Sequence, residues 1–266
     1  MKKYLSILII SFLPCLVFAG VFEDSCSIIA RKKASTVDSY TSHIVARYRA
    51  ENNTNDSVGG NDLTPNDTIT YNSVSPLEGS YSIDFESTAA RKATRTDANL
   101  DAGFPGKSGG SSPTSFTIMG EIKGESWPDI VYPICKYDVT NDKRTWAVKI
   151  DTSGDLYFSI GYSSGTVFED TTHHASALSA GTNYKFAIAY NTSTKAYRIR
   201  LYQVGTGVLG TDITSTTTEA MSITDSDFCI GTRSDGFTGA FDGLWDDFVI
   251  CNAYLTTTQM DEYFAE

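Results

Sequence analysis

From residue 44 onward the chain is a succession of short runs rich in Val, Ile, Tyr, Phe and Thr, separated by clusters of Gly, Asn, Asp and Ser. Such runs are typical of β-strands, and the clusters between them are typical of turns. In Tyr81–Phe85, apolar and polar residues alternate as they do in a strand with one buried face. The strands predicted in this way are 44–50, 81–85, 116–122, 130–136, 146–150, 156–160, 184–190, 197–204, 228–231 and 245–251.

The composition supports an all-β fold around one large core. Hydrophobic residues make up 41% of the 266 residues, which is enough to bury a core, and the chain is rich in Thr, Tyr and Gly. Segments 151–155 and 190–194 have turn residues where hairpins are expected. Only the C-terminal end has a helix signal, because Thr256 and Gln259 have the spacing of a capping box. We therefore predict a two-sheet antiparallel sandwich with a short C-terminal helix.

The first residues have the organisation of a secretion signal. Lys2 and Lys3 precede an apolar run, and Ala19 ends a segment of small residues that suits cleavage. The run is shorter than the roughly 20 apolar residues that a membrane-spanning helix needs. We predict a signal peptide over 1–19, a lead-in over 20–42 and one domain over 43–266. The mature chain is expected to have no membrane span and to be secreted or displayed on the cell surface.

The charge balance excludes one class of partner. The chain has 32 acidic and 21 basic residues, a formal net charge of −11, and this acidic balance is spread along the sequence rather than clustered. Proteins that bind nucleic acids need clustered Lys and Arg to attract phosphates. We therefore expect no nucleic-acid partner.

Four cysteines follow the predicted signal peptide. An even number in an exported chain is compatible with two disulfides, for which three connectivities exist. Cys229 and Cys251 lie in two late predicted strands and are the preferred pair. The other two cysteines are Cys26 and Cys135.

Five segments resemble, in the same order and spacing, the LamG-like jelly rolls of the concanavalin A-like lectin/glucanase superfamily. Residues 116–123, FTIMGEIK, are similar to the family strand FTISAWVK. Glu121 and Asn183 stand at positions where the family usually has tryptophan. The other segments are ICKYD at 134–138, WAVKIDTSGDLY at 146–157, the segment that begins AGTNY at 180–202, and the closing segment at 228–260.

The resemblance covers about residues 44–266 and implies a jelly roll of two curved antiparallel sheets. Members of the family act mostly as carbohydrate-binding or adhesion modules, and many carry one calcium ion. Other members hydrolyse or cleave polysaccharides, so the same resemblance also requires a search for catalytic carboxyl groups.

That search finds no catalytic pattern. A retaining glycosidase needs two carboxyl groups about 5–5.5 Å apart, and the family pattern is Glu-x-Asp-x-Glu. Ser82–Glu86 comes near it, but Ser82 occupies the place of the first acid. Glu121–Glu125 has both outer acids but Lys123 in the middle. We therefore predict that the protein is not an enzyme.

A calcium site is predicted where the first and last strands meet. Asp246 has apolar neighbours on either face of its strand, so its carboxylate must be neutralised, hydrogen-bonded or bound to a cation. In jelly rolls of this kind the first and last strands are neighbours, and Glu51 and Asp56 end the first strand. Calcium takes six to eight oxygen ligands. We predict that Glu51, Asp56 and Asp246 bind calcium, with Asp247 as a substitute; alternatively, Asp246 bonds backbone amides or Arg49, and Asp56 belongs to an ordinary turn.

Four residues are candidates for a sugar-binding surface. Exposed aromatic rings stack on sugar C–H faces, and neighbouring polar side chains bind the hydroxyls. Trp127 lies among polar residues in a predicted loop and is the best ring candidate; the alternative is that it folds back onto the sandwich edge. Tyr162, Arg233 and Asp235 are loop residues that could line a rim.

The sequence thus indicates a secreted, non-catalytic module that binds glycans or cell-surface components and is stabilised by calcium. Two alternatives stay open. One is a structural or adhesive protein of a cell surface or virion whose partner is a protein. The other is a divergent polysaccharide hydrolase or lyase.

Overall fold

The computed structural model describes residues 38–266 except 90, 112–114 and 237–238. The predicted signal peptide, most of the lead-in and Cys26 lie outside the described residues. The compact unit that contains the strands begins at Tyr40, just before the expected boundary at residue 43. No helix within the described ranges is long and apolar enough to cross a membrane.

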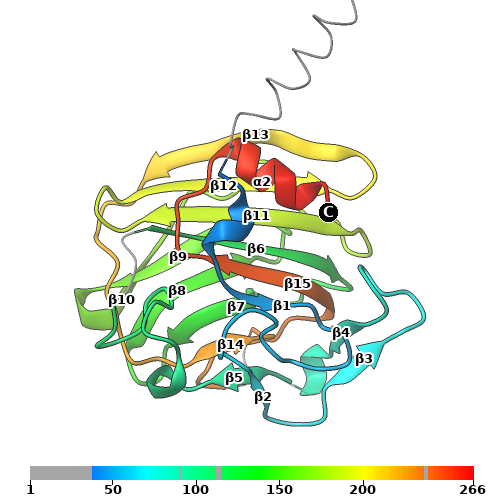
Figure 1. The fold of residues 1–266 in the computed structure, drawn as a ribbon, viewed down its shortest axis with the longest axis horizontal. Coiled ribbons are helices and arrows are strands. Elements are labelled where there is room, and N and C mark those ends of the chain that lie inside the picture. The colour runs from blue at the N-terminus through cyan, green and yellow to red at the C-terminus, as the bar shows by residue number, and fades with distance from the viewer. Residues whose placement is uncertain (1–37, 90, 112–114, 237–238) are drawn as a thin grey trace, which may run out of the picture. The chain divides into compact units, whose positions relative to one another are not determined.

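Two antiparallel sheets form a sandwich (Figure 1). The first sheet is the one that contains β6 and β15, and the second sheet is the one that contains β7 and β14. The described part of the first sheet has the order β13 (Gly207–Thr216), β12 (Ala196–Gln203), β11 (Tyr184–Asn191), β6 (Ser115–Gly124), β15 (Gly243–Cys251), β4 (Ser82–Phe85) and β3 (Thr70–Asn72), with β1 (Ile44–Tyr48) also paired to β15. That of the second sheet is β10 (Val167–Asp170), β9 (Leu156–Tyr162), β8 (Lys143–Ile150), β7 (Val131–Asp138), β14 (Phe228–Ile230), β5 (Ala93–Arg95) and β2 (Thr64–Pro65).

Aromatic rings fill the space between the sheets. Trp146 of the second sheet lies 6.1 Å from Phe116 of the first, and Trp146 and Phe228 are also 6.1 Å apart, measured between ring centres. All of these side chains have no exposed surface. Full burial of one such ring removes about 150–250 Å² from water, so these rings help to hold the two sheets together.

A bulge in β15 changes which residues face the core. Asp247 has a φ of 40°, and the pairing of β15 with β6 shifts between Asp246 and Val249. Because one extra residue is inserted, Trp245 and Phe248 both face the core and stack with ring centres 4.1 Å apart. Strict alternation would have put them on opposite faces. The bulge therefore leaves Asp246 on the outer face of the first sheet.

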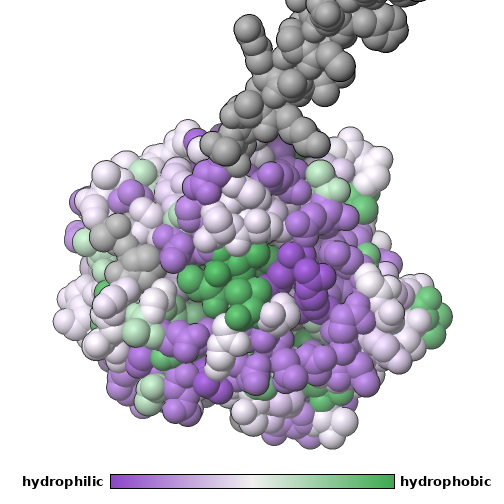
Figure 2. Space-filling model, in the orientation of Figure 1, coloured by the Kyte–Doolittle hydropathy of each residue, from purple (hydrophilic) through white to green (hydrophobic). Residues whose placement is uncertain are grey.

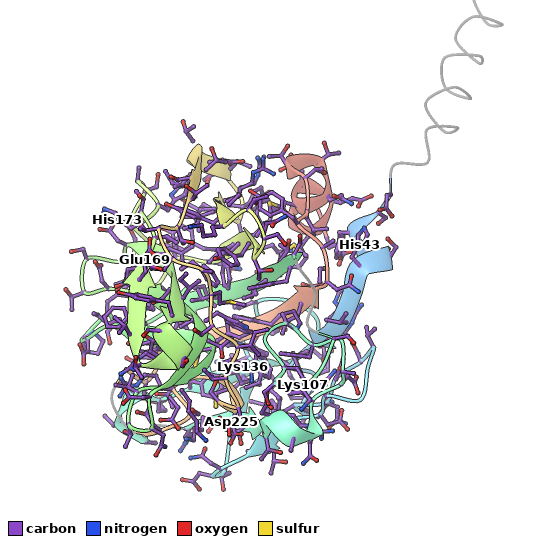
Figure 3. All side chains as sticks on the ribbon, turned by 90° about the vertical axis from the view of Figure 1, so that its left-hand side faces the viewer. His43, Lys107, Lys136, Glu169, His173 and Asp225 are labelled. Atoms are coloured by element: carbon purple, nitrogen blue, oxygen red, sulfur yellow. The ribbon has the colours of Figure 1, made fainter. Side chains whose placement is uncertain are left out.

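The outer face of the first sheet is covered by two short helices, η1 (Tyr40–His43) and α2 (Thr257–Phe264). The edge-on view of Figure 3 shows them on the outside of one layer, with the strands of the second sheet on the opposite side. The predicted capping box is confirmed: Thr256 accepts from the Gln259 amide, and Gln259 accepts from the Thr256 amide. Tyr263, Met260 and Phe264 form the face of α2 that packs on the sheet.

The ten predicted strands are confirmed, with ends that differ by a few residues. Three short strands, β2, β3 and β5, were not predicted, nor were β10 and β13. β10 and β13 are edge strands of their sheets. Most of their residues are exposed or half-buried, so they lack the alternation that a buried face imposes.

The predicted disulfide between Cys229 and Cys251 is wrong. Cys229 lies on β14 of the second sheet, opposite Cys135 of β7, whereas Cys251 ends β15 of the first sheet and packs beneath α2. Cys135, Cys229 and Cys251 are buried free thiols. Sequence patterns identified both residues as strand residues but could not tell that they belong to different sheets.

These three thiols are expected to resist alkylation in the folded protein and to react after unfolding in guanidinium. The reason is burial, which shields the sulfur atoms and raises the pKa of Cys135 and Cys251 to about 12. Mass spectrometry of peptides alkylated before and after unfolding measures this. A Cys229–Cys251 cross-linked peptide in a non-reduced digest would contradict the placement of these cysteines in different sheets.

Candidate ligand-binding groove

A polar groove lies at one end of the second sheet, where several connecting segments meet. It consists of two adjoining cavities of about 620 and 510 Å³, which share Ser108 and Asp225. The larger, here called the first cavity, is lined by Ser108, Asn141, Asp142, Lys143, Ser164, Thr166, Ser222, Ile223, Thr224 and Asp225. The second cavity is lined by Thr96, Asp97, Ala98, Lys107, Ser108, Asp225 and Asp227.

The walls come from loops rather than from strand interiors. The β7–β8 turn contributes Asn141 and Asp142, and the short helix η4 (Ser163–Gly165) contributes Ser164. The short helix η3 (Asp97–Asn99) and the segment that precedes β14 supply most of the rest. Figure 3 shows Lys107 and Asp225 close together in the lower part of the view, with Lys136 near them.

The charged residues at the rim are paired with one another. Lys143 Nζ lies 2.9 Å from Asp225 Oδ2, and both side chains remain well exposed, at 41% and 59%. Arg144 lies 2.8 Å from Asp142 and also donates to the carbonyl oxygens of Gly165 and Thr166. Arg144 thereby joins the β7–β8 turn to η4, two of the segments that line the first cavity.

Beneath the second cavity lies a buried ion pair. Lys136 has no exposed surface, and its Nζ donates to Asp97 Oδ1 at 2.8 Å and to the Ser226 carbonyl oxygen. Ser108 donates to Asp97 from its amide and its hydroxyl. Burial alone would raise the pKa of Asp97, but the hydrogen bonds from Lys136 and Ser108 outweigh it and hold this pKa below its ordinary value. Asp97 is therefore an ionised carboxylate at neutral pH.

Hydroxyl groups hold the irregular segment before β14 in place. Thr145 Oγ1, on β8, lies 2.7 Å from Thr224 Oγ1 and accepts the Thr224 amide at 3.1 Å. Thr224 Oγ1 also donates to Ser226 Oγ at 3.1 Å. Ser222 donates its amide to the Gly161 carbonyl oxygen at 2.7 Å. Since this segment is not part of a β-strand, these hydrogen bonds hold it in position along the groove.

Of the residues predicted to bind sugar, Asp235 and Arg233 support the groove without lining it. Asp235 Oδ2 accepts from the amides of Val139 and Thr140, at 3.1 and 2.8 Å. These bonds tie the loop after β14 to the β7–β8 turn. Burial opposes ionisation of Asp235, but the bonds from Thr140 hold its pKa below the ordinary value. The Arg233 guanidinium lies near Asp235 and 5.4 Å from the ring centre of Tyr132.

The other two predicted sugar-binding residues lie in different places. Tyr162 is half-buried and is the last residue of β9, directly before η4 in the sequence. It is therefore two residues away from Ser164, which lines the first cavity. Trp127 is not part of the groove. Its Nε1 donates to the Leu178 carbonyl oxygen at 3.0 Å, and its ring packs over Gly124 and near Phe241. Trp127 thus folds back onto the sandwich edge, which was the alternative to an exposed sugar-binding ring.

The residues predicted to bind calcium are only partly brought together. Glu51 and Asp246 line one cavity of about 80 Å³, together with Arg49, Glu78, Gly79 and Asp247. Asp56 does not line it. Its carboxylate accepts from the amides of Arg47, Val58 and Asn61, which is the role of an ordinary turn residue.

Within the described ranges, no group of three or more acidic, His or Cys side chains is placed to hold a metal ion. Calcium binding stays a prediction from the sequence. Asp247, the proposed substitute, is held by Arg47, with Nε 2.7 Å from Oδ1.

Asp246 is held by hydrogen bonds. It accepts from the Ser82 hydroxyl at 2.7 Å, from the Asp247 amide at 2.8 Å and from the Glu78 amide at 3.3 Å. Burial raises its pKa to about 8, against these bonds, and the charge of Glu121 on the neighbouring strand adds to the rise. Asp246 is therefore largely protonated at neutral pH, which explains how it is accommodated where charge is costly.

The sequence did not reveal the groove. Its lining residues are Ser, Thr, Asn, Asp and Lys in connecting segments, and this composition is also typical of ordinary turns. A second cluster was also missed, on the outer face of the second sheet. There Lys149 lies 4.4 Å from the ring centre of Phe168 and 5.2 Å from that of Tyr137, and it pairs with Asp170 at 2.8 Å. The side chains of this cluster contact one another.

Replacing Lys136 by Met is expected to lower the free energy of unfolding by about 3–5 kcal/mol, because it leaves Asp97 buried without its main partner. The double variant Lys136→Met/Asp97→Asn removes both charges and is expected to lose less than the single variant. Denaturant unfolding of the wild type, both single variants and the double variant measures the coupling. Simple addition of the two single effects would contradict a direct ion pair.

Asp246→Asn is expected to flatten the pH dependence of stability. The folded-state pKa of about 8 exceeds the ordinary value of 3.8, so the folded chain binds more protons than the unfolded chain between these values. Stability therefore falls as pH rises through this window, and Asn cannot contribute to that fall.

Thermal melting at several pH values measures the effect, with Asp225→Asn, an exposed acid, as the control. Equal slopes for wild type and Asp246→Asn would contradict the prediction. The same melts with millimolar calcium test the calcium prediction, since an ion that binds only the folded chain raises the melting temperature.

Comparison of the sequence with known proteins does not assign the chain to a family, because no family model and no curated protein matches it. Solved structures do match the fold. The binding domain of Paraclostridial Mosquitocidal Protein 1 has a TM-score of 0.60 and 14% identity over 85% of this chain and 52% of that one. The binding domain of botulinum neurotoxin serotype D/C has a TM-score of 0.59 and 12% identity over 85% of this chain and 53% of that one.

A third match is botulinum neurotoxin type C, whose cell entry depends upon interaction with two ganglioside molecules. It has a TM-score of 0.57 and 12% identity over 84% of this chain and 51% of that chain. The chain thus spans about half the length of each of these three structures. At such identities the likeness concerns the fold alone, and it shows that this sandwich is a jelly roll.

Proposed function

We propose that the protein is a secreted, non-catalytic module that binds glycans in the groove. The observation that carries the proposal is the lining of the two cavities: hydroxyls, an amide and paired charges that converge on one space from separate loops. Sugars present many hydroxyl groups that donate and accept at once, and such a lining matches them. Both cavities also fall within the range of about 300–1,000 Å³ that is usual for small-ligand sites.

Each cavity also offers a small apolar surface. Ile223 is 49% exposed and lines the first cavity, and Ala98 is exposed in the second. Such groups contact the C–H faces of a sugar while the polar neighbours bind its hydroxyls. Membership of the concanavalin A-like superfamily is part of the proposal, supported by the five resembling segments and the jelly-roll fold. The ganglioside interaction of neurotoxin type C, which has the same fold, is further support.

A non-catalytic role is supported by where two carboxyl groups with raised pKa values lie. A glycosidase needs a general acid with a raised pKa beside the bound sugar. Asp246 and Glu78 have raised pKa values through burial, but they line the 80 Å³ cavity, which is too small for a sugar ring. In the groove, Asp97 has a lowered pKa and holds no proton to donate.

Adhesion through a protein partner is the second candidate, and one observation favours it. Figure 2 shows a hydrophobic patch in the middle of one face, over the start of β1 and surrounded by hydrophilic surface. The half-buried Ile44 and Val45 begin that strand. Exposed apolar patches of this kind mark surfaces that bind other proteins.

A glycan array tests the proposal. The wild type is expected to bind at least one glycan group, and Asp225→Ala and Lys143→Ala are expected to weaken that binding about tenfold or more, because both side chains are exposed in the groove. Asp261→Ala is the matched control, since Asp261 is also a half-exposed acid in an ion pair but lies on α2. Equal loss in all three variants, or no binding to any glycan, would refute glycan binding in the groove.

A further inference from the structure

The two cavities of the groove adjoin each other at shared residues. Ser108 and Asp225 line both of them, so these two residues mark the boundary between the cavities. Each cavity alone is large enough for a small ligand. A single ligand that fills both must therefore have at least two units, with the link between them at Ser108 and Asp225.

Each described lysine that lines the groove is paired with a carboxylate. Lys143 pairs with Asp225 at 2.9 Å, and Lys107 lies 3.4 Å from Asp97. An acidic ligand would find the charge of each of these lysines already neutralised by a neighbouring carboxylate. It would also meet the carboxylates of Asp225 and Asp227 in the second cavity and a chain with a net charge of −11.

Uncharged hydroxyls meet no such obstacle. Asp225 uses Oδ2 for Lys143, and a carboxylate has several acceptor positions on its two oxygens. A sugar hydroxyl can therefore add to these ion pairs without breaking them. Ile223 and Ala98 place one exposed apolar contact in each cavity, which suits a ligand that repeats the same kind of unit.

We infer that the ligand of the groove is an uncharged oligosaccharide that spans both cavities, with adjacent sugar units on either side of Ser108 and Asp225. This inference rests on the proposed glycan binding and makes it specific: length and neutrality, rather than an acidic sugar, determine affinity.

Two sets of probes test it by calorimetric titration of the full mature chain. The first is a ladder of neutral gluco-, xylo- and manno-oligosaccharides from one unit to six. The second is a matched pair, lactose and sialyllactose. Affinity for at least one neutral ladder is expected to rise about tenfold or more from one unit to three and then to level off. Sialyllactose is expected to bind no more tightly than lactose, and salt is expected to leave the affinities unchanged.

Ala98→Glu places a bulky acid in the second cavity and is expected to abolish the gain from added units while leaving short ligands bound. Asn99→Glu, on the same short helix but outside the lining, is the control. Tighter, salt-sensitive binding of sialyllactose, or an affinity that does not depend on length, would overturn this inference while glycan binding itself stands. No binding to any probe or to the array would overturn both.

Discussion

The ion pair between Lys136 and Asp97 is the interaction on which the groove depends. A lysine with no exposed surface can be tolerated only beside a carboxylate and other acceptors, because its charge is costly away from water. Asp97 comes from η3 and the second acceptor, the Ser226 carbonyl, from the segment before β14. One strand residue thus fixes two irregular segments against the sheet. The hydroxyl bonds of Thr145 and the amide bonds to Asp235 then complete walls that have no ladder of their own.

The strands could be predicted because a strand with one buried face has apolar residues at alternate positions in its sequence. β11 and β12 pack one face against the core, so their apolar residues recur at regular intervals. β13 has ten residues but is an exposed edge strand with two glycines at positive φ, and nothing in its composition separates it from a loop. The sequence also carries no signal for the bulge at Asp247, since the bulge depends on how β15 is paired with β6. The groove was beyond prediction because its residues come from segments that only the folded chain brings together.

Glu121 of β6 and Asn183, directly before β11, contact each other. Asn183 Nδ2 donates to Glu121 Oε1 at 2.6 Å, and Lys185 Nζ lies 3.8 Å from the other oxygen of Glu121. Glu121 is buried and Asn183 is half-buried, so this polar contact on the outer face of the first sheet is largely removed from solvent. Burial raises the pKa of Glu121 although Asn183 and Lys185 oppose the rise.

The two ends of the compact unit meet on the same side of the sandwich. The Tyr40 amide donates to Glu262, its hydroxyl donates to Glu266, and its ring lies edge-on to Tyr263. Chain ends that lie in contact can be joined by a short linker and new ends opened elsewhere, with little change in the packed interior. This jelly roll is therefore well suited to circular permutation. The old ends would be linked, and the new N- and C-termini would be opened in the turn of the β12–β13 hairpin or of another hairpin.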